Sequence, residues 1–382
     1  MNLRRIGPFR PDAFRSPARS ERTAAVLGVA LGVSFATCFA TGLYSHLAQH
    51  PPAWFHLPAR PAGLYRVTQG LHVATGLAAI PLLLAKLWTV FPKLFAWPPF
   101  TSAASALARL CLLPLVGGAV FLLFTGLANI NLWYPWPFNF PVAHYWTAWI
   151  TVGALIVHIG AEATTTRRAF RRAPAPASAS EPAPGMTRRQ LLVTAFGVSG
   201  LVTLVTVGQT VGPLRKLALL APRRPDTGPQ GFPVNRTART AGVEESARSP
   251  QYRLVVSGRV RRRITLTLDE VRAMPRHSAT LPIACVEGWS ATRTWEGIRL
   301  RDLLARAGVS GARAVRVESL QRRRSYRSSL VGAEQVADPD TLLALRVDGE
   351  DLHLDHGYPV RLIGPNRPGV MQTKWVTRVV VL

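Results

Sequence analysis

Long apolar stretches separated by short polar segments dominate the first 212 residues. Crossing a bilayer takes about 20 helical residues, and five stretches reach that length: 24–48, 67–90, 106–130, 142–163 and 191–212. No small-residue cleavage site follows the first stretch, which favours an uncut anchor over a signal peptide. The pattern therefore predicts a membrane α-helical bundle of five transmembrane helices.

The pattern changes after residue 250 to short apolar or alternating runs. Strands are predicted over 252–258, 279–284, 314–318, 359–363 and 375–382. A capping-box pattern from Thr267 to Glu270 predicts a short helix, and leucines at helical spacing from residue 300 predict another. Strands mixed with short helices in this order indicate an α+β domain.

These patterns divide the chain into six segments. We expect a basic tail over 1–23, a four-helix transmembrane bundle over 24–165, a Pro/Ala-rich linker over 166–190, a fifth helix over 191–212, a tether over 213–250 and the α+β domain over 251–382.

The arginines predict the orientation. The formal net charge is +26, which in a soluble protein would suggest nucleic-acid binding. Here the arginines fall beside the apolar stretches and in linkers, so we expect membrane lipid as the partner and no nucleic acid. By the positive-inside rule the basic tail and the segment between the fourth and fifth stretches are cytoplasmic. The α+β domain is then exoplasmic, on a multi-pass protein of the cell membrane.

Cys285 is the candidate reactive residue of the α+β domain. It ends the predicted strand 279–284 and is followed by a glycine turn at Gly288 and by tryptophans. One interpretation is a buried, inert thiol, because free cysteine is often buried. The other is a thiolate ligand for a soft metal.

Three sequence blocks resemble the sulfite-oxidase-type molybdopterin domain, of the branch similar to bacterial methionine sulfoxide reductases. They are Cys285-Val-Glu-Gly-Trp-Ser with Trp295-Glu-Gly-Ile-Arg-Leu, then His356-Gly-Tyr-Pro-Val-Arg361, then Gly369-Val-Met-Gln-Thr-Lys374-Trp375. The resemblance covers about a third of the chain.

That resemblance implies a molybdenum cofactor and a role for each matching residue. Cys285 would ligate molybdenum and act with Tyr326 in catalysis, while the cofactor-binding residues would be Asn235, His356, Arg361 and Lys374. Imidazole, guanidinium and ammonium groups suit an anionic pterin phosphate. Tyr326 has an equally good interpretation as an ordinary strand aromatic.

Thr187-Arg188-Arg189 precedes the fifth apolar stretch and is similar to a twin-arginine export signal placed internally. A domain whose cofactor is inserted in the cytoplasm would cross the membrane already folded. The alternative is an ordinary block of positive charge before a membrane helix.

Histidines within the apolar stretches suggest a second cofactor. His144 and His158 are 14 residues apart, about 21 Å along one helix face. This spacing resembles the paired axial ligands of membrane cytochromes b. His72 provides an outer partner for His144, whereas the matching inner position is Lys86. We expect one haem b, bound by His72 and His144, with His158 as an alternative ligand. The competing hypothesis is a haemless anchor.

Together these features predict a membrane-bound molybdenum-dependent oxidoreductase. Its exoplasmic domain would carry out oxygen-atom transfer on a small molecule, an S- or N-oxide or sulfite. Electrons would be exchanged with quinone through the bundle. The alternative is a non-catalytic membrane electron carrier or sensor with a degenerate molybdopterin-like module.

Overall fold

The computed structural model of the 382-residue chain describes residues 14, 16–95, 101–171, 185–208, 211–224, 226–309, 311, 313–322 and 326–382. Most of the predicted basic tail and the Pro/Ala-rich part of the linker lie outside these residues. The chain divides into two compact units. The first contains Met1–Ala40, Leu71–Gly208 and Leu217–Leu220, and the second contains Thr41–Gly70, Gln209–Lys216 and Ala221–Leu382.

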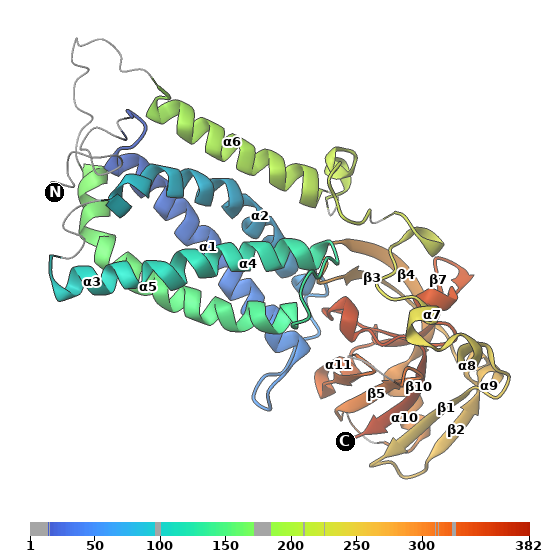
Figure 1. Cartoon of the computed structure of the whole chain (residues 1–382). Coiled ribbons are helices and arrows are strands. Elements are labelled where there is room, and N and C mark those ends of the chain that lie inside the picture. Colours follow the sequence, from blue (N-terminus) through green and yellow to red (C-terminus); the bar gives the residue numbers. More distant parts are fainter. Residues whose placement is uncertain are drawn as a thin grey trace. The chain divides into compact units, whose positions relative to one another are not determined.

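Among the described residues, five helices are long and apolar enough to cross a membrane, as the hydropathy pattern predicted. Figure 1 shows α1 (Glu21–Gln49), α2 (Leu64–Val90, continued by η3, Phe91–Phe95), α3 (Ala103–Leu110) with α4 (Leu112–Ile130), α5 (Phe140–Arg171) and α6 (Arg188–Val207). The third stretch is thus divided, because α3 ends and α4 begins at Cys111.

Small residues let the helices of the first unit pack closely. An apolar cluster joins four helices through Leu27, Ala79, Ala119 and Ala195, which come from α1, α2, α4 and α6. The hydroxyl of Ser199 on α6 donates a hydrogen bond of 2.9 Å to the carbonyl of Ala78 on α2. The helices are therefore held by close contacts and side-chain hydrogen bonds, the means that membrane bundles use.

Most of the apolar surface of these helices points outward. Only 11–28% of the most apolar window of each helix is buried. Large side chains such as Leu113, Ile150 and Val193 are more than 60% exposed. A continuous apolar exterior of this kind is unfavourable in contact with water and favourable in contact with an apolar medium.

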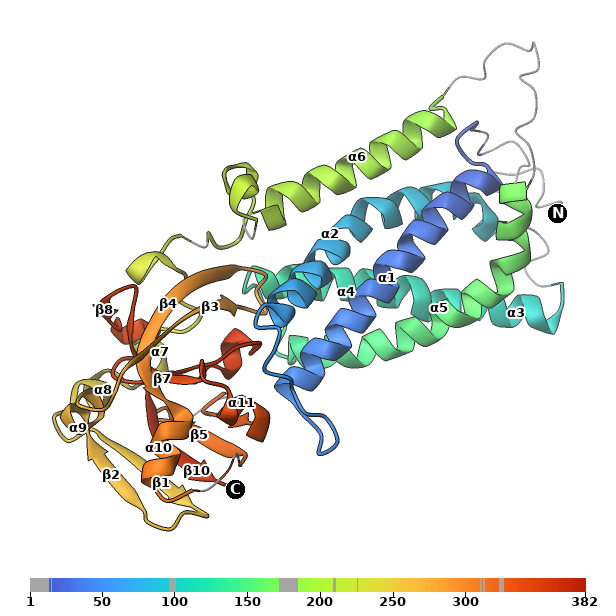
Figure 2. The ribbon, with the colours of Figure 1, turned by 180° about the vertical axis from the view of Figure 1, so that it is seen from behind.

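The second unit contains two five-stranded sheets (Figure 2). The first has the order β2-β1-β10-β5-β6 and the second the order β3-β4-β7-β8, with β9 also paired to β7. The strands are β1 (Arg253–Gly258), β2 (Ile264–Thr267), β3 (His277–Ala284), β4 (Ser290–Arg299), β5 (Val315–Ser319), β6 (Ser328–Val331), β7 (Leu342–Val347), β8 (Glu350–Asp351), β9 (Arg361–Ile363) and β10 (Val376–Val381). β1 and β10 are parallel, and the other pairs are antiparallel.

Both faces of β7 are buried because it separates two hydrophobic clusters. Successive strand residues point to opposite faces. Leu343 and Leu345 therefore pack in one cluster with the first sheet, whereas Leu342 and Ala344 pack in another around Trp295. β9, which carries Arg361, pairs with the buried residues Leu342, Leu343 and Ala344 of this strand.

Short helices connect the strands. They are α9 (Leu268–Arg272), α10 (Leu300–Arg306), α11 (Ala333–Ala337), η7 (Leu354–His356) and η8 (Gly369–Met371). The predicted capping box is present: the Thr267 side chain accepts from the Glu270 N–H, and the Glu270 carboxylate accepts from the Thr267 N–H. The α+β prediction agrees with this arrangement of sheets and short helices.

Two predicted segment boundaries need correction. Part of the segment assigned to a tether over 213–250 packs into the α+β domain instead. After η5 (Gly212–Leu217), this part forms η6 (Pro229–Gly231), α7 (Ala238–Ala241) and α8 (Glu244–Arg248), and it buries Phe232, Ala238 and Val243. In addition, Thr41–Gly70, which we predicted within the bundle, belongs to the second unit. Buried contacts to residues distant in sequence decide both boundaries, and composition does not reveal such contacts.

Candidate functional site

Cys285 lies at the tip of the hairpin formed by β3 and β4. The backbone N–H of Cys285 donates to the carbonyl of Trp289 at 2.9 Å, and the N–H of Gly288 donates to the carbonyl of Cys285 at 3.1 Å. Gly288 has φ of +87°, in the left-handed region that glycine adopts readily. A glycine turn therefore fixes the direction of the thiol, as the sequence led us to expect.

The Cys285 thiol is only 2% exposed. Burial raises its pKa, and the nearby Glu287 carboxylate raises it further. The thiol is therefore protonated and poorly nucleophilic by itself. A metal ion that binds the sulfur would displace this proton, because only the thiolate is a metal ligand.

The predicted site residues of the α+β domain converge on one small pocket. It is lined by Pro233, Asn235, Ile283, Cys285, Trp289, His356, Arg361, Gly369 and Lys374. These residues come from four separate parts of the chain, within 233–235, 283–289, 356–361 and 369–374. Five of the six residues that the resemblance implied are thus brought together, and Tyr326 is the one that does not line the pocket.

His356 is held in a single orientation at the end of η7. Its Nε2 donates to the carbonyl of Pro229 at 2.7 Å, and its ring stacks on Phe232 with centroids 3.7 Å apart. Burial lowers its pKa to about 3, and the positive charge of Arg361 contributes. With its proton on Nε2, the neutral ring has an acceptor lone pair on Nδ1.

Arg361 is a buried cation. It is 3% exposed, its Nη1 donates to the carbonyl of His356 at 3.0 Å, and its guanidinium lies 5.4 Å from the ring centroid of Trp295. Burial lowers its pKa to about 9, so it remains charged at neutral pH. Its Nε is buried and has no hydrogen-bond partner among the described residues.

Lys374 provides a second cationic group on the same pocket. Its Nζ donates to the carbonyls of Arg236 at 2.5 Å and Asp355 at 2.9 Å. Burial lowers its pKa, and the charge of Arg361 lowers it further. Within the described part of the chain, no carboxylate forms an ion pair with Arg361 or Lys374.

This combination of groups fits an anionic pterin cofactor. A buried guanidinium with an unsatisfied N–H is costly unless an acceptor completes it. Phosphate oxygens are the acceptors that Arg binds in bidentate fashion. The Cys285 thiol in the wall of the same pocket would supply the soft ligand that a metal in this cofactor needs.

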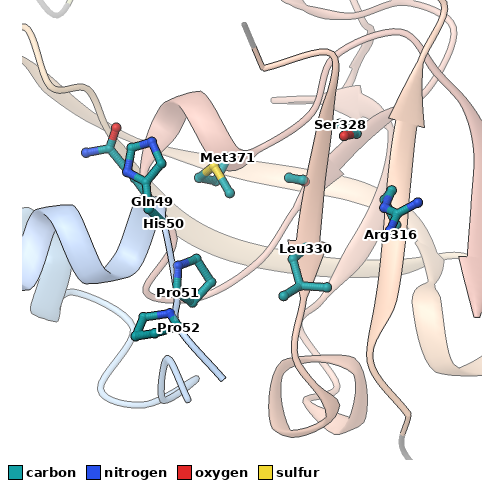
Figure 3. A pocket seen from close by; sticks show the side chains of 9 residues that line it. Gln49, His50, Pro51, Pro52, Arg316, Ser328, Leu330 and Met371 are labelled. Atoms are coloured by element: carbon teal, nitrogen blue, oxygen red, sulfur yellow. The ribbon is translucent and has the colours of Figure 1, made fainter. Parts of the chain in front are cut away.

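Tyr326 lies outside the pocket and before β6. Its backbone has φ of +64°, and its hydroxyl donates to the side-chain carbonyl of Gln49 at 3.2 Å. An open cavity of about 470 Å³ lies between residues 49–52 on one side and β5, β6 and Met371 on the other (Figure 3). Arg316 and Ser328 contribute polar groups to its wall, and Figure 3 shows these side chains opposite His50.

A buried acidic residue that we did not predict lies two positions after Cys285. Glu287 is 7% exposed and pairs with Arg223 Nε at 3.1 Å, and it accepts from Trp289 Nε1 at 3.0 Å. Burial raises the pKa of Glu287. Its place inside the Cys285 block was a usable signal, but nothing in the sequence identified Arg223 as its partner.

The first unit brings His72 and His144 together. Their ring centroids are 6.2 Å apart. His72 Nδ1 is 2.9 Å from the carbonyl of Cys38, and His144 Nδ1 is 2.8 Å from the hydroxyl of Thr125. Because the carbonyl can only accept, His72 carries its proton on Nδ1. The Thr125 hydroxyl donates to the carbonyl of Phe121 at 2.8 Å, so it accepts from His144.

In that protonation state both Nε2 atoms bear the lone pair that metal ligation requires. Metal-binding histidines usually donate their other N–H to a carbonyl or similar acceptor. The bond from an imidazole nitrogen to a metal is about 2.0–2.1 Å long. Two rings whose centroids are 6.2 Å apart are near enough to be ligands of one ion.

The inner position differs. Lys86 Nζ donates to the carbonyl of Ala24 on α1 at 2.6 Å, close to Gly28. His158 is partly exposed on α5. Lys86 is therefore hydrogen-bonded to the backbone of α1. It occupies the position where a histidine would be needed to pair with His158.

Comparison with known proteins agrees with this geometry. The family model described as "Oxidoreductase molybdopterin binding domain" matches residues 240–382. An uncharacterized oxidoreductase, YuiH of Bacillus subtilis, is 30% identical over 146 residues, which cover 38% of this chain and 71% of that protein.

Two further relatives carry more specific names. Mitochondrial sulfite oxidase of Drosophila melanogaster is 32% identical over 155 residues, 34% of this chain and 27% of that protein. The putative protein-methionine-sulfoxide reductase subunit YedZ1 of Azospira oryzae is 32% identical over 162 residues, 42% of this chain and 59% of that protein. The chain therefore matches less than two thirds of either of these proteins.

Proposed function

The chain belongs to the oxidoreductases that have a sulfite-oxidase-type molybdopterin-binding domain, and from this premise we propose a membrane-bound enzyme that reduces or oxidises a small sulfur or nitrogen compound outside the cell membrane. The observation that carries the proposal is the pocket that unites the Cys285 thiol with the buried Arg361, Lys374 and His356. A thiol beside two buried cationic groups matches an anionic cofactor that carries a soft metal.

Each group has a distinct task in this proposal. Cys285 binds the metal through sulfur. Arg361 and Lys374 bind the phosphate, and Arg361 uses the buried Nε that is otherwise unsatisfied. His356 accepts a hydrogen bond at Nδ1, and Asn235 closes the pocket from the segment before α7. When bound, the cofactor supplies two-electron redox chemistry of the oxygen-atom-transfer type.

The substrate class follows from the relatives and from the open cavity. The names of two relatives refer to sulfite and to methionine sulfoxide. The cavity of about 470 Å³ beside β5 and β6 offers Arg316, Ser328 and His50 to a polar substrate. We place the substrate among S-oxides, N-oxides and sulfite, with Tyr326 at the margin of this cavity as a candidate catalytic residue.

The membrane location is supported by five apolar helices with outward apolar surfaces. Lipid is the surrounding that such surfaces need. The arginines near the ends of α1, α5 and α6 favour a cytoplasmic location for these ends. After five crossings the C-terminal domain is exoplasmic, and a twin-arginine signal at Arg188 and Arg189 directs its export.

A haem b bound by His72 and His144 completes the electron path. Both histidines donate their Nδ1 proton to an acceptor and direct the Nε2 lone pair elsewhere. His72 and His144 would hold this haem, which would supply one-electron chemistry between the molybdenum domain and quinone. The ligand-ready pair is the observation that favours this part of the proposal.

Cofactor analysis of the purified full-length protein tests the proposal. We expect one molybdenum and one pterin per chain, one b-type haem, and turnover with a sulfoxide, an N-oxide or sulfite. Protein that folds and inserts but contains no molybdenum after expression in a cofactor-competent host would contradict the assignment. Protein that contains molybdenum but no haem would support the assignment as an enzyme and would contradict the proposed electron path.

A further inference from the structure

The second unit contains one segment that comes from the N-terminal half of the chain. Thr41–Gly70 covers the end of α1, the connection over 50–63 and the first turns of α2. It belongs to the same compact unit as the pocket around Cys285. Its contacts there are specific: several are made to Asn366, and two involve the residues on either side of the thiol.

Asn366 fixes this segment. It is 2% exposed and follows β9 in a left-handed conformation with φ of +50°. Its side-chain carbonyl accepts from the Tyr65 N–H at 2.8 Å, and its amide donates to the carbonyl of Pro58 at 2.7 Å and to the hydroxyl of Tyr44 at 3.0 Å. Its backbone N–H donates to the carbonyl of Ala62 at 3.0 Å. Every one of these partners lies in Thr41–Gly70, so the buried amide is satisfied by that segment.

The start of α2 contacts the residues on both sides of Cys285. Tyr65 is 1% exposed and packs in one apolar cluster with Ala284. Gln69 donates from Nε2 to the carbonyl of Val286 at 3.3 Å. Tyr65 and Gln69 are four residues apart and therefore share a face of the helix. The hydroxyl of Tyr65 is hydrogen-bonded to Ser45 Oγ at 2.9 Å, which ties this face to α1.

A surface ion pair aligns the connection. Arg60 donates from Nε to Asp338 at 2.9 Å and from Nη2 to Asp340 at 2.5 Å. The arginine is about half exposed, so the pair contributes little to stability. The planar guanidinium of Arg60 nevertheless contacts two carboxylates at once, which favours one alignment of the segment on the domain.

We propose that Thr41–Gly70 is a positioning element for the metal-binding thiol. Asn366 holds the segment, and Tyr65 and Gln69 set the backbone of the hairpin that presents Cys285. Functional groups must be held to within about 0.5 Å, and a hairpin tip is held to that precision only by contacts beyond its own turn. The inference rests on the proposed function, because it takes Cys285 as the ligand of the metal. α2 also carries His72, seven residues after Tyr65, so one helix would serve both cofactors.

Hydrogen exchange of the purified full-length protein tests the proposal. In Asn366→Ala we expect the amides of residues 283–290 to exchange at least about tenfold faster, because several buried hydrogen-bonding groups lose their partner. Arg378→Ala is the matched control. Arg378 lies in the same domain, pairs with Glu318 at 3.8 Å and has no part in the segment. We expect the control to leave exchange at the hairpin unchanged.

A milder variant separates positioning from general stability. Gln69→Ala removes only the contact to the Val286 carbonyl, and we expect faster exchange confined to residues 283–290. We also expect a changed electron paramagnetic resonance signal of the metal and a lower kcat with an unchanged KM. Unchanged hairpin exchange in both variants would overturn the proposal, as would exchange that rises equally throughout the domain. If wild-type protein lacks molybdenum, the proposed function fails, whereas the exchange comparison still decides whether the segment orders the hairpin.

Discussion

The imidazoles of His72 and His144 lie with their ring centroids 6.2 Å apart, and each directs Nδ1 to an acceptor on a neighbouring helix. Cys38 on α1 provides one acceptor, and Thr125 on α4 provides the other. Four helices therefore set the two rings, which is the arrangement expected of histidines with a ligand role.

The first prediction concerns haem content. His72→Ala and His144→Ala should each lose the b-type haem, because one imidazole alone does not complete the axial pair. His158→Ala is the matched control and should retain it. A pyridine haemochrome assay on detergent-purified protein measures the content. Two haems per chain, or haem loss in the His158 variant alone, would place the site elsewhere.

The second prediction concerns the orientation of one ligand. Thr125→Val keeps the size of the side chain and removes the acceptor for His144 Nδ1–H. We expect the haem to remain bound with a shifted reduction potential, because the hydrogen bond sets the basicity of the imidazole. Potentiometric titration of wild type and variant measures this. An identical potential would show that the hydroxyl has no influence on the ligand.

The third prediction is a pH dependence of stability. The pKa of buried His356 is lowered to about 3, whereas an unfolded histidine has a pKa of about 6.5. Between these values the unfolded state binds more protons, so stability contributed by His356 is complete above about pH 6.5 and is lost as pH falls towards 3. The slope from this group approaches about 1.4 kcal/mol per pH unit.

Replacing His356 by Gln removes the titrating group and should flatten that slope. Unfolding of the C-terminal domain, followed by tryptophan fluorescence from pH 4 to pH 7, measures it. A variant that loses stability with pH as steeply as wild type would show that His356 remains protonated in the folded domain.

The fourth prediction concerns export. Arg188→Lys together with Arg189→Lys should leave the C-terminal domain inside, since a twin-arginine signal requires both guanidinium groups. Arg167→Lys together with Arg168→Lys is the control. It makes the same two changes at arginines outside the motif and should leave export normal. Protease accessibility in spheroplasts reports the location, and normal export of the double lysine variant would favour ordinary membrane insertion.

The helices and the main site residues were predictable because their signals are local. An apolar stretch of about 20 residues is sufficient to identify a long helix. Cys285 was identified by a strand that ends in a glycine turn, and the resemblance located His356, Arg361 and Lys374. The structure then places all four on one pocket.

The contacts that hold this site together were not predictable. Asn366 and Tyr65 are 301 residues apart, and neither has a neighbouring pattern that points to the other. Glu287 and Arg223 are a similar case. Such pairs are determined by tertiary packing, so a single sequence carries no periodic signal for them. The same limitation explains why Thr41–Gly70 was assigned to the bundle.

The central claim is that the Cys285 thiolate is a ligand of the molybdenum. X-ray absorption at the molybdenum edge, on full-length wild type and Cys285→Ser, counts the sulfur ligands of the metal. We predict one Mo–S bond fewer in the variant and little or no turnover, with Cys111→Ala as a control that leaves both unchanged. An equal number of sulfur ligands in wild type and Cys285→Ser would contradict the account.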